Sequence, residues 1–336
     1  MAQRFKVVDA HVGGTPVRLL LDGVPTPSGQ TMEKRRMWLQ RRHDHLRRAT
    51  LLEPRGRPDL VGALLTEPVS READAGLIFL DASGYPVHNI SAVIATATVA
   101  LEHGLMTKAA STSGVVPLAF DTPGGLVHVE AECATVSAVP RVTTVRVSGA
   151  PSFVAYAGCA VTTPTRSLRV DLAFGGTFFG IADSEAAGVP LTPERLPEIR
   201  RLGAEICRAL EGHDALVHPE SGQATLGGVI FTGPPQSPDA HLRAVSVTPD
   251  GACERSGLTG ASAVMAVLNA MGLLEDGQEF VQEGLLALPA RGRVARLARV
   301  GEIPAIVAEI EASAWITAEQ TLMVDDDDPL AEGYVI

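Results

Sequence analysis

The sequence predicts an α+β protein of two related domains, each with a buried helix surrounded by short strands. The first observation is the length, because a chain of 336 residues is longer than most single domains and is typical of two. The second is a pair of apolar helix patterns, one over residues 89–104 and one over residues 259–272. Both begin at polar residues, continue through small and aliphatic side chains, and end at a glycine. Short strand patterns flank each helix, so the second half of the chain repeats the plan of the first.

Strand and helix patterns alternate along the first half of the chain. Residues 5–18 indicate two strands joined by a Gly-Gly turn, and residues 32–48, rich in Arg, Leu and Glu, predict a helix. Residues 77–82 form an apolar run short enough for a buried strand. Pro86 disfavours helix just before it, so the first apolar helix begins near Asn89. That helix is apolar on almost every face, which predicts a buried position in a domain core.

The second half continues with the same kinds of element. Residues 119–170 alternate short β-type runs with Gly, Pro and Ser. A helix is expected to begin where Pro193 takes the first helical position. Residues 227–232 and 244–248 indicate strands before the second apolar helix, and a strand pattern at 314–323 returns to the first domain. The predicted domains are residues 1–148 with 316–336, and residues 149–315.

Composition and charge exclude several classes of protein. The chain is 46% hydrophobic and 20% charged, which suits packed cores rather than disorder. A formal net charge of -11 argues against a nucleic-acid-binding surface. The basic run at 41–48 is interrupted by Asp44 and predicts a solvated helix face. The acidic run at 325–328 lacks the ordered spacing of calcium ligands and predicts a solvated tail.

Targeting and cofactor motifs give no positive signal. The first residues lack an apolar signal segment, and the apolar run at 90–101 is too short to cross a membrane. The four cysteines are widely spaced without a CxxC pair, which argues against a disulfide framework or a zinc site. No HExxH, P-loop or Rossmann glycine motif occurs, so neither a metal nor a nucleotide is expected. We therefore expect a cytoplasmic protein with free thiols and no cofactor.

The two apolar helices also suggest where chemistry could occur. Helix N-termini carry unpaired N–H groups and partial positive charge, so they bind anions such as a carboxylate. Two such ends facing one cleft would hold an amino acid's carboxylate and stabilise the charge that develops when a Cα proton leaves. The alternative is that both helices serve only as domain cores, and the two interpretations are compatible.

Seven segments carry a resemblance to a known family when they are taken in this order and spacing. They are Asp9–Arg18 (DAHVGGTPVR), His45–Gly56 (HLRRATLLEPRG), Gly84–Gly104, Val170–Phe179 (VDLAFGGTFF), Gly228–Pro234 (GVIFTGP), Glu254–Ala266 and Ala314–Thr317 (AWIT). The sequence resembles the proline racemase family over essentially the whole chain. That resemblance implies the diaminopimelate epimerase type of fold, with two pseudo-symmetric domains that each wrap a twisted, mostly antiparallel sheet around a central helix. It also implies a site between the two helix N-termini, a small amino-acid-like carboxylate as substrate, and a homodimer.

The departures from the family pattern fall on its catalytic positions. Where family members carry a motif like MCGHGTIA, this sequence places Asn89 at the thiol position and Ser91 at the histidine position. The second motif resembles DRSPCGTGTSA, and here the loop is one residue shorter. The second thiol position therefore falls on Gly257, Leu258 or Thr259. Racemisation needs two titratable groups, one on each face of Cα, and an amide, a glycine or a leucine supplies none. Two-thiol racemase activity is therefore not expected.

Three other side chains are candidates for catalysis. His88 titrates near neutral pH, and the alternative is a histidine hydrogen-bonded beside a helix start. Glu254 matches the family's aspartate that contacts the substrate nitrogen and could serve as a base, and the alternative is a surface salt bridge. Cys253 could be a reactive thiol, and the alternative is a small buried hydrophobic residue. Substrate contacts are expected from Asn89, Ile90, Ser91, Phe174, Gly257, Leu258, Thr259 and Gly260.

The reaction that demands least of such groups is a double-bond shift. A conjugated substrate such as a pyrroline carboxylate has protons far more acidic than the Cα–H of proline. We therefore expect a cofactor-independent isomerase or tautomerase that acts on a cyclic proline-like carboxylate, in a specialised biosynthetic pathway. One alternative is a trans-3-hydroxyproline dehydratase with rearranged groups, in which Thr259 supplies the hydroxyl. Another alternative is a non-catalytic protein that still binds a carboxylate at the helix N-termini.

Overall fold

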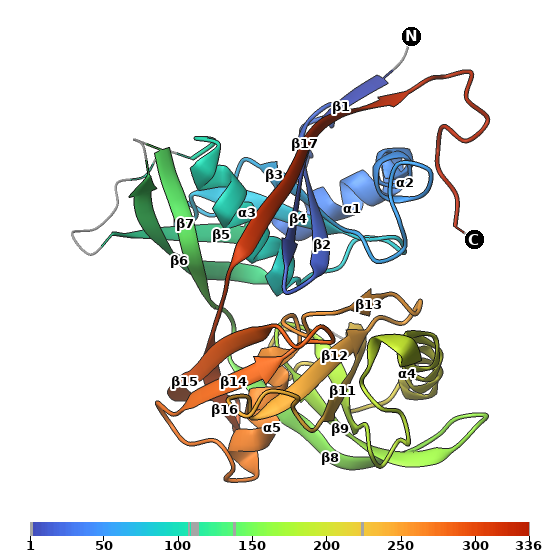
Figure 1. The fold of residues 1–336 in the computed structure, drawn as a ribbon, viewed down its shortest axis with the longest axis vertical. Coiled ribbons are helices and arrows are strands. Elements are labelled where there is room, and N and C mark those ends of the chain that lie inside the picture. Colours follow the sequence, from blue (N-terminus) through green and yellow to red (C-terminus); the bar gives the residue numbers. More distant parts are fainter. Residues whose placement is uncertain (1–2, 107, 109–113, 137–138, 223–224, 336) are drawn as a thin grey trace. The chain divides into compact units, whose positions relative to one another are not determined.

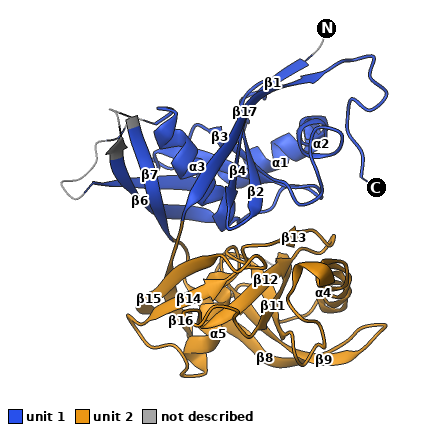
Figure 2. Ribbon diagram, in the orientation of Figure 1, with its two compact units in different colours: residues 1–147, 313–336 blue, residues 148–312 orange. Residues whose placement is uncertain are grey.

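The chain forms two compact units, which Figure 2 colours separately. The computed structural model describes residues 3–106, 108, 114–136, 139–222 and 225–335. Unit 1 comprises Met1–Val147 with Ser313–Ile336, and unit 2 comprises Ser148–Ala312. The last strand, β17 (Ala314–Val324), belongs to unit 1 and pairs antiparallel with β1 (Gln3–Val12).

Unit 1 is built from strands and three helices (Figure 1). Besides β1 and β17, its elements are β2 (Thr15–Asp22), α1 (Met32–Arg42), α2 (Asp44–Leu51), β3 (Val61–Thr66), β4 (Ala75–Leu80), α3 (Ile90–Glu102), β5 (Val115–Thr122), β6 (Gly125–Val136) and β7 (Val139–Ser148). Successive pairs from β1 to β6 are antiparallel, parallel, antiparallel, parallel and antiparallel. Parallel neighbours need a long connection, and the helices lie in the two connections that precede β3 and β5.

Unit 2 repeats this plan (Figure 1). Its elements are β8 (Ser152–Thr162), β9 (Ser167–Phe174), β10 (Phe178–Asp183), the 3-10 turn η1 (Pro193–Arg195), α4 (Leu196–Leu210), β11 (Leu226–Gly233), β12 (Leu242–Val247), β13 (Cys253–Glu254), α5 (Ala261–Ala270), β14 (Glu279–Glu283), β15 (Pro289–Val300) and β16 (Ile303–Ala312). The pairs β9–β10, β10–β11, β11–β12, β12–β14 and β14–β15 follow the same series of directions. The α4 and α5 helices occupy the two parallel crossovers, so the predicted α+β fold with two pseudo-symmetric halves is confirmed.

Each unit wraps its strands around one helix. The α3 helix packs against β1, β2, β3 and β17, and every residue from Ile90 to Leu101 is buried. The α5 helix packs against β8, β9, β10 and β16. Both helices consist of small and aliphatic residues, which lets strands approach from several sides without leaving voids. No helix among the described residues is both long and apolar enough to span a membrane.

Two sequence predictions in the α1–α2 region are confirmed only in part. The helix expected over residues 32–48 is broken at His43, whose φ of -138° ends α1 and whose N–H donates to Leu39 O. The basic run at 41–48 was predicted to be a solvated face, and Arg41 and Arg42 are exposed, but Arg47 is only 6% exposed. Its guanidinium donates hydrogen bonds to backbone carbonyls of a distant loop. A charged side chain can be buried when its hydrogen-bond donors are satisfied in this way.

Candidate functional site

The start of α3 is capped by Asn89. This residue is extended, with φ -160° and ψ 108°, and its Oδ1 accepts a hydrogen bond from Ala92 N at 2.8 Å. Because the side-chain oxygen accepts from this amide, the side-chain NH2 group remains the part that can donate to a ligand. Ile90 and Ser91 follow in the first turn and are buried, with 4% and 0% exposure. Asn89 is therefore the side chain at this helix start best placed to contact a ligand.

His88 directly precedes this cap and is 9% exposed. Its Nε2 is buried and finds no hydrogen-bond partner within the described part of the chain. Burial lowers the pKa of His88 from 6.5 to about 4, so the imidazole is neutral at pH 7. Buried polar atoms are rarely left unpaired in native proteins, and those that are often mark functional sites. His88 is thus a neutral, desolvated imidazole whose Nε2 is not held by a hydrogen bond within the described residues.

His88 also makes the stability of the fold depend on pH. An unfolded histidine is protonated below pH 6.5, whereas the buried imidazole takes up its proton only near pH 4. Its contribution to stability is therefore complete above pH 6.5 and is lost as the pH falls towards 4. Between about pH 7 and about pH 4.5 we expect His88 to lower the free energy of unfolding by about 2 kcal/mol. Urea unfolding at both pH values measures this, and the H88Q variant should lack that share of the loss. Equal pH dependence in the two proteins would contradict the burial of a neutral imidazole.

The loop before α5 is organised by Glu254. The Glu254 side chain is 8% exposed, so it is not a surface salt-bridge residue. Its Oε1 accepts from Thr259 Oγ1 at 2.8 Å and from Ser256 Oγ at 3.4 Å, and its Oε2 accepts from Thr259 N at 3.2 Å. The carboxylate therefore closes the loop upon itself and pairs directly with a hydroxyl. Such a pair can exchange a proton with a ligand and can also orient the helix start.

Two glycines let this loop approach the sheet of unit 2. Gly257 has a φ of 66°, and a Cβ atom there would lie 2.6 Å from Ala244 O. Gly260 is the N-cap of α5, and a Cβ atom there would overlap the side chain of Ile230. Leu258 between them is 1% exposed. Of the three residues that could occupy the second thiol position, Thr259 alone carries a polar side chain, and Gly257 and Leu258 serve the packing.

Phe174 and Cys253 lie in the hydrophobic core of unit 2. Phe174 is 3% exposed and stacks on Phe153 with ring centroids 5.4 Å apart. Its neighbour Gly175 borders α5, because a Cβ atom there would lie 2.8 Å from Ala263 N. Cys253 is 2% exposed and pairs with Val247 across β12 and β13. The positions favour packing roles for both side chains, while the glycine admits close contact with the first turn of α5.

Two polar residues near α5 were not identified from the sequence. Ser246 on β12 lies opposite Glu254 in the strand register, and its buried Oγ has no hydrogen-bond partner among the described residues. Gln282 donates from Nε2 to Gly257 O at 3.0 Å, and its buried Oε1 is likewise unpaired where the structure describes the chain. A serine within the buried strand LRAVSV was the available sequence signal for the first of these.

The chemistry available at the two helix starts is proton transfer and anion binding. In unit 1 a neutral imidazole and an amide donor adjoin the start of α3. In unit 2 a carboxylate–hydroxyl pair adjoins the start of α5. The described residues contain no group of three or more His, Cys, Asp or Glu side chains arranged to hold a metal ion.

Comparisons with known proteins agree with this organisation. The family model described as proline racemase matches residues 7–335. The trans-3-hydroxy-L-proline dehydratase of Azospirillum brasilense is 33% identical over 339 residues, which cover 100% of this chain and 99% of the relative. The 4-hydroxyproline epimerase of Brucella suis is 33% identical over 335 residues, covering 99% and 98%. A solved structure of a probable proline racemase from Agrobacterium radiobacter, with bound carbonate, has a TM-score of 0.89 at 26% identity and covers 99% of this chain and 96% of that one. The epimerase-type fold is thereby confirmed.

Proposed function

Because the chain belongs to the proline racemase family, we propose that it is a cofactor-independent isomerase that shifts a double bond in a cyclic proline- or pyrroline-type carboxylate. The observation that supports this most is the buried, unpaired Nε2 of His88 next to the cap of α3, as far as the described residues extend. Two of the relatives named above are a trans-3-hydroxy-L-proline dehydratase and a 4-hydroxyproline epimerase, so their names point to cyclic amino acids as substrates. A substrate of the same class therefore suits the donors at this helix start.

The weakness of His88 as a base decides which substrates suit it. An imidazole whose conjugate acid has a pKa of about 4 cannot efficiently remove a poorly acidic Cα proton from a saturated amino acid. In a pyrroline carboxylate the proton next to the imine is much more acidic, because the electrons it leaves are delocalised into the C=N bond. Asn89 stands where the family's thiol would be, and it offers no second base. The available groups therefore favour a conjugated substrate.

The proposed step is a tautomerisation. His88 Nε2 takes a proton from the ring carbon beside the C=N bond, the C–H electrons form a new C=C bond, and the C=N π electrons move to the ring nitrogen. The ring nitrogen then takes a proton from the imidazolium or from solvent. When solvent supplies it, the imidazolium gives its own proton back to solvent, so His88 is neutral again after each turnover. Asn89 donates its side-chain N–H to the substrate carboxylate, and the partial positive charge of the α3 start favours that anion.

A second candidate function is dehydration of a trans-3-hydroxyproline. It is favoured by the hydrogen bond of 2.8 Å between Thr259 Oγ1 and Glu254 Oε1, which joins a hydroxyl to a carboxylate in a buried loop. A relative of 33% identity is named as such a dehydratase. In this reaction a base removes the Cα proton and an acid protonates the departing hydroxyl. Such acid–base catalysis would depend on the Glu254–Thr259 pair more than on His88.

The test is incubation in D2O with a panel of ring compounds, followed by NMR. The panel contains L-proline, the 3- and 4-hydroxyprolines and unsaturated pyrroline carboxylates, each with a buffer-only control because imines exchange protons spontaneously. We expect accelerated deuterium uptake only with the unsaturated compounds. Loss of water from a 3-hydroxyproline would establish the second candidate instead. Binding by calorimetry without exchange or elimination of any compound would overturn both and leave a carboxylate-binding protein.

A further inference from the structure

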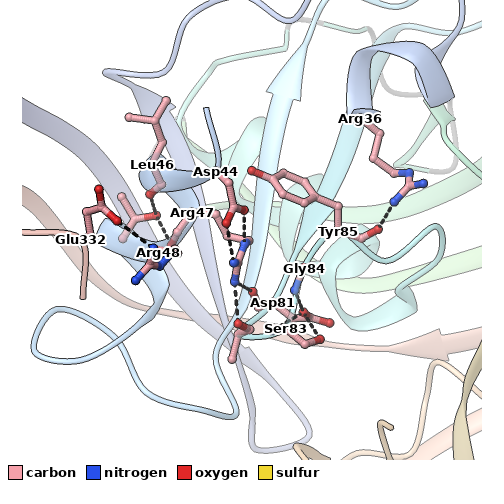
Figure 3. A network of polar contacts seen from close by, with 12 residues as sticks. Arg36, Asp44, Leu46, Arg47, Arg48, Asp81, Ser83, Gly84, Tyr85 and Glu332 are labelled. Atoms are coloured by element: carbon pink, nitrogen blue, oxygen red, sulfur yellow. Dashed lines mark hydrogen bonds and ion pairs between the residues drawn. The ribbon is translucent and has the colours of Figure 1, made fainter. Parts of the chain in front are cut away.

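The segment that carries His88 into α3 has no strand or helix of its own. Residues 81–89 connect β4 to α3 and form bends without ladder hydrogen bonds. The position of His88 therefore depends on side chains that bind this segment from elsewhere in unit 1. Figure 3 shows these contacts, which come from α1 and α2.

Arg47 on α2 makes the densest set of these contacts. Its Nη1 donates to Asp81 O at 2.9 Å and to Ala82 O at 2.6 Å. Its Nε and Nη2 donate to the two carboxylate oxygens of Asp44 at 2.7 and 2.9 Å, which fixes the plane of the guanidinium (Figure 3). The same group lies 5.9 Å from the ring centroid of Tyr85. The buried guanidinium of Arg47 thus fixes the beginning of the segment through hydrogen bonds to its backbone.

Other contacts complete the restraint. Asp81 Oδ1 accepts from Ser83 N, Ser83 Oγ and Gly84 N at 2.7–2.9 Å, which closes a turn inside the segment. Arg36 on α1 donates to Tyr85 O at 2.7 Å (Figure 3). These bonds determine the path of the backbone between Asp81 and Tyr85.

The end of the segment is bounded by a glycine. A Cβ atom at Gly124 would lie 2.8 Å from Val87 O, so the backbone before His88 rests directly on the turn between β5 and β6. The segment is therefore anchored by side chains at residues 81–85 and by backbone packing at residue 87. His88 itself has no anchor through Nε2 among the residues described, so its position follows from these neighbours.

We propose that Arg47 is a positioning residue, which acts through the 81–87 segment to keep the His88 imidazole buried beside the cap of α3. Its effect on catalysis rests on the proposed function, whereas its effect on the burial of His88 does not. Lysine at this position would keep the charge but could not bind Asp44 and two carbonyls in one plane. Arg48 is the matched control, because it pairs with Glu332 on an exposed face and leaves the segment untouched (Figure 3).

The first test is NMR titration of His88 in the wild-type protein and in R47K, R47M and R48Q. The His88 signal is assigned by its loss in H88Q. We expect R47M to move the pKa of His88 from about 4 towards the ordinary value of 6.5, because water reaches the ring. R47K should give a smaller change and R48Q none. If R47M does not fold, R47K alone decides, because it keeps a buried cation beside Asp44. A wild-type pKa for His88 in a folded Arg47 variant would overturn the proposal.

The second test is the rate of deuterium uptake on whichever compound the panel identifies. We expect R47M to lower kcat by roughly tenfold to a hundredfold with a smaller change in KM, because a displaced base affects the reacting geometry more than binding. R48Q should keep the wild-type rate. If His88 shifts its pKa but no compound reacts even with the wild-type protein, the positioning role stands and the proposed reaction fails. An unchanged kcat in R47M and R47K would show that the anchor is not needed for catalysis.

Discussion

H88Q is expected to slow deuterium uptake on the responsive ring compound by roughly 10²–10⁴-fold, the usual contribution of a general base. Glutamine is polar and similar in length, but it cannot accept a proton at neutral pH. The buried Nε2, unpaired in the described structure, is the atom assigned to that proton. The rate is measured by NMR in D2O at saturating substrate, with circular dichroism to verify that the variant is folded.

The control for this variant is H103Q. His103 is the C-cap of the same helix, at the end opposite to Asn89, and its Nε2 lies 3.6 Å from Glu319 Oε1. Its loss should leave the exchange rate within about twofold of the wild type, since surface substitutions away from a site rarely matter. Full activity in H88Q would remove His88 from the mechanism and direct attention to the Glu254–Thr259 pair.

N89D is expected to weaken carboxylate binding strongly while leaving the fold intact. Aspartate caps a helix as well as asparagine, and its charge is favoured by the helix dipole, so the melting temperature should stay equal or rise slightly. The same charge repels the carboxylate of the ligand, and like charges in contact cost several kcal/mol. Affinity measured by calorimetry should therefore fall at least about a hundredfold.

N89A separates the two roles of this side chain. Loss of the cap should lower the free energy of unfolding by about 1 kcal/mol, and binding should weaken less than in N89D because no repulsive charge is added. A carboxamide analogue of the ligand provides the second control, since N89D should bind it as well as the wild type does. Equal carboxylate affinity in N89D and the wild type would place the carboxylate away from this helix start.

The core of the fold was predictable because its signals are local. Each central helix carries small apolar residues on every face, and the first has its Asn89 cap directly before them. The strand patterns at 227–232 and 244–248 correspond to β11 and β12 within two residues. Such features depend on residues a few positions apart in the sequence, so they can be predicted without knowledge of the tertiary structure.

The sequence supplied candidate residues for the site but not the environment of their side chains. Burial of His88 and the missing partner of its Nε2 within the described chain depend on contacts from distant segments. Arg47 is buried because its guanidinium donates hydrogen bonds to carbonyl groups 34 and 35 residues away in the sequence. The residue pattern of the helix gives no sign of such distant partners. The hydrogen bond between Glu254 and Thr259 likewise depends on the path of the loop. Because that path is not evident from the sequence, the sequence alone could not decide which of three residues occupies the second thiol position.

The most direct measurement compares L-proline with a pyrroline-2-carboxylate in D2O, using the same protein and the H88Q variant. We expect deuterium uptake by the pyrroline compound above its buffer rate, loss of that acceleration in H88Q, and no uptake by proline. Exchange at the Cα of proline, or exchange on the pyrroline compound that H88Q leaves unchanged, would contradict it.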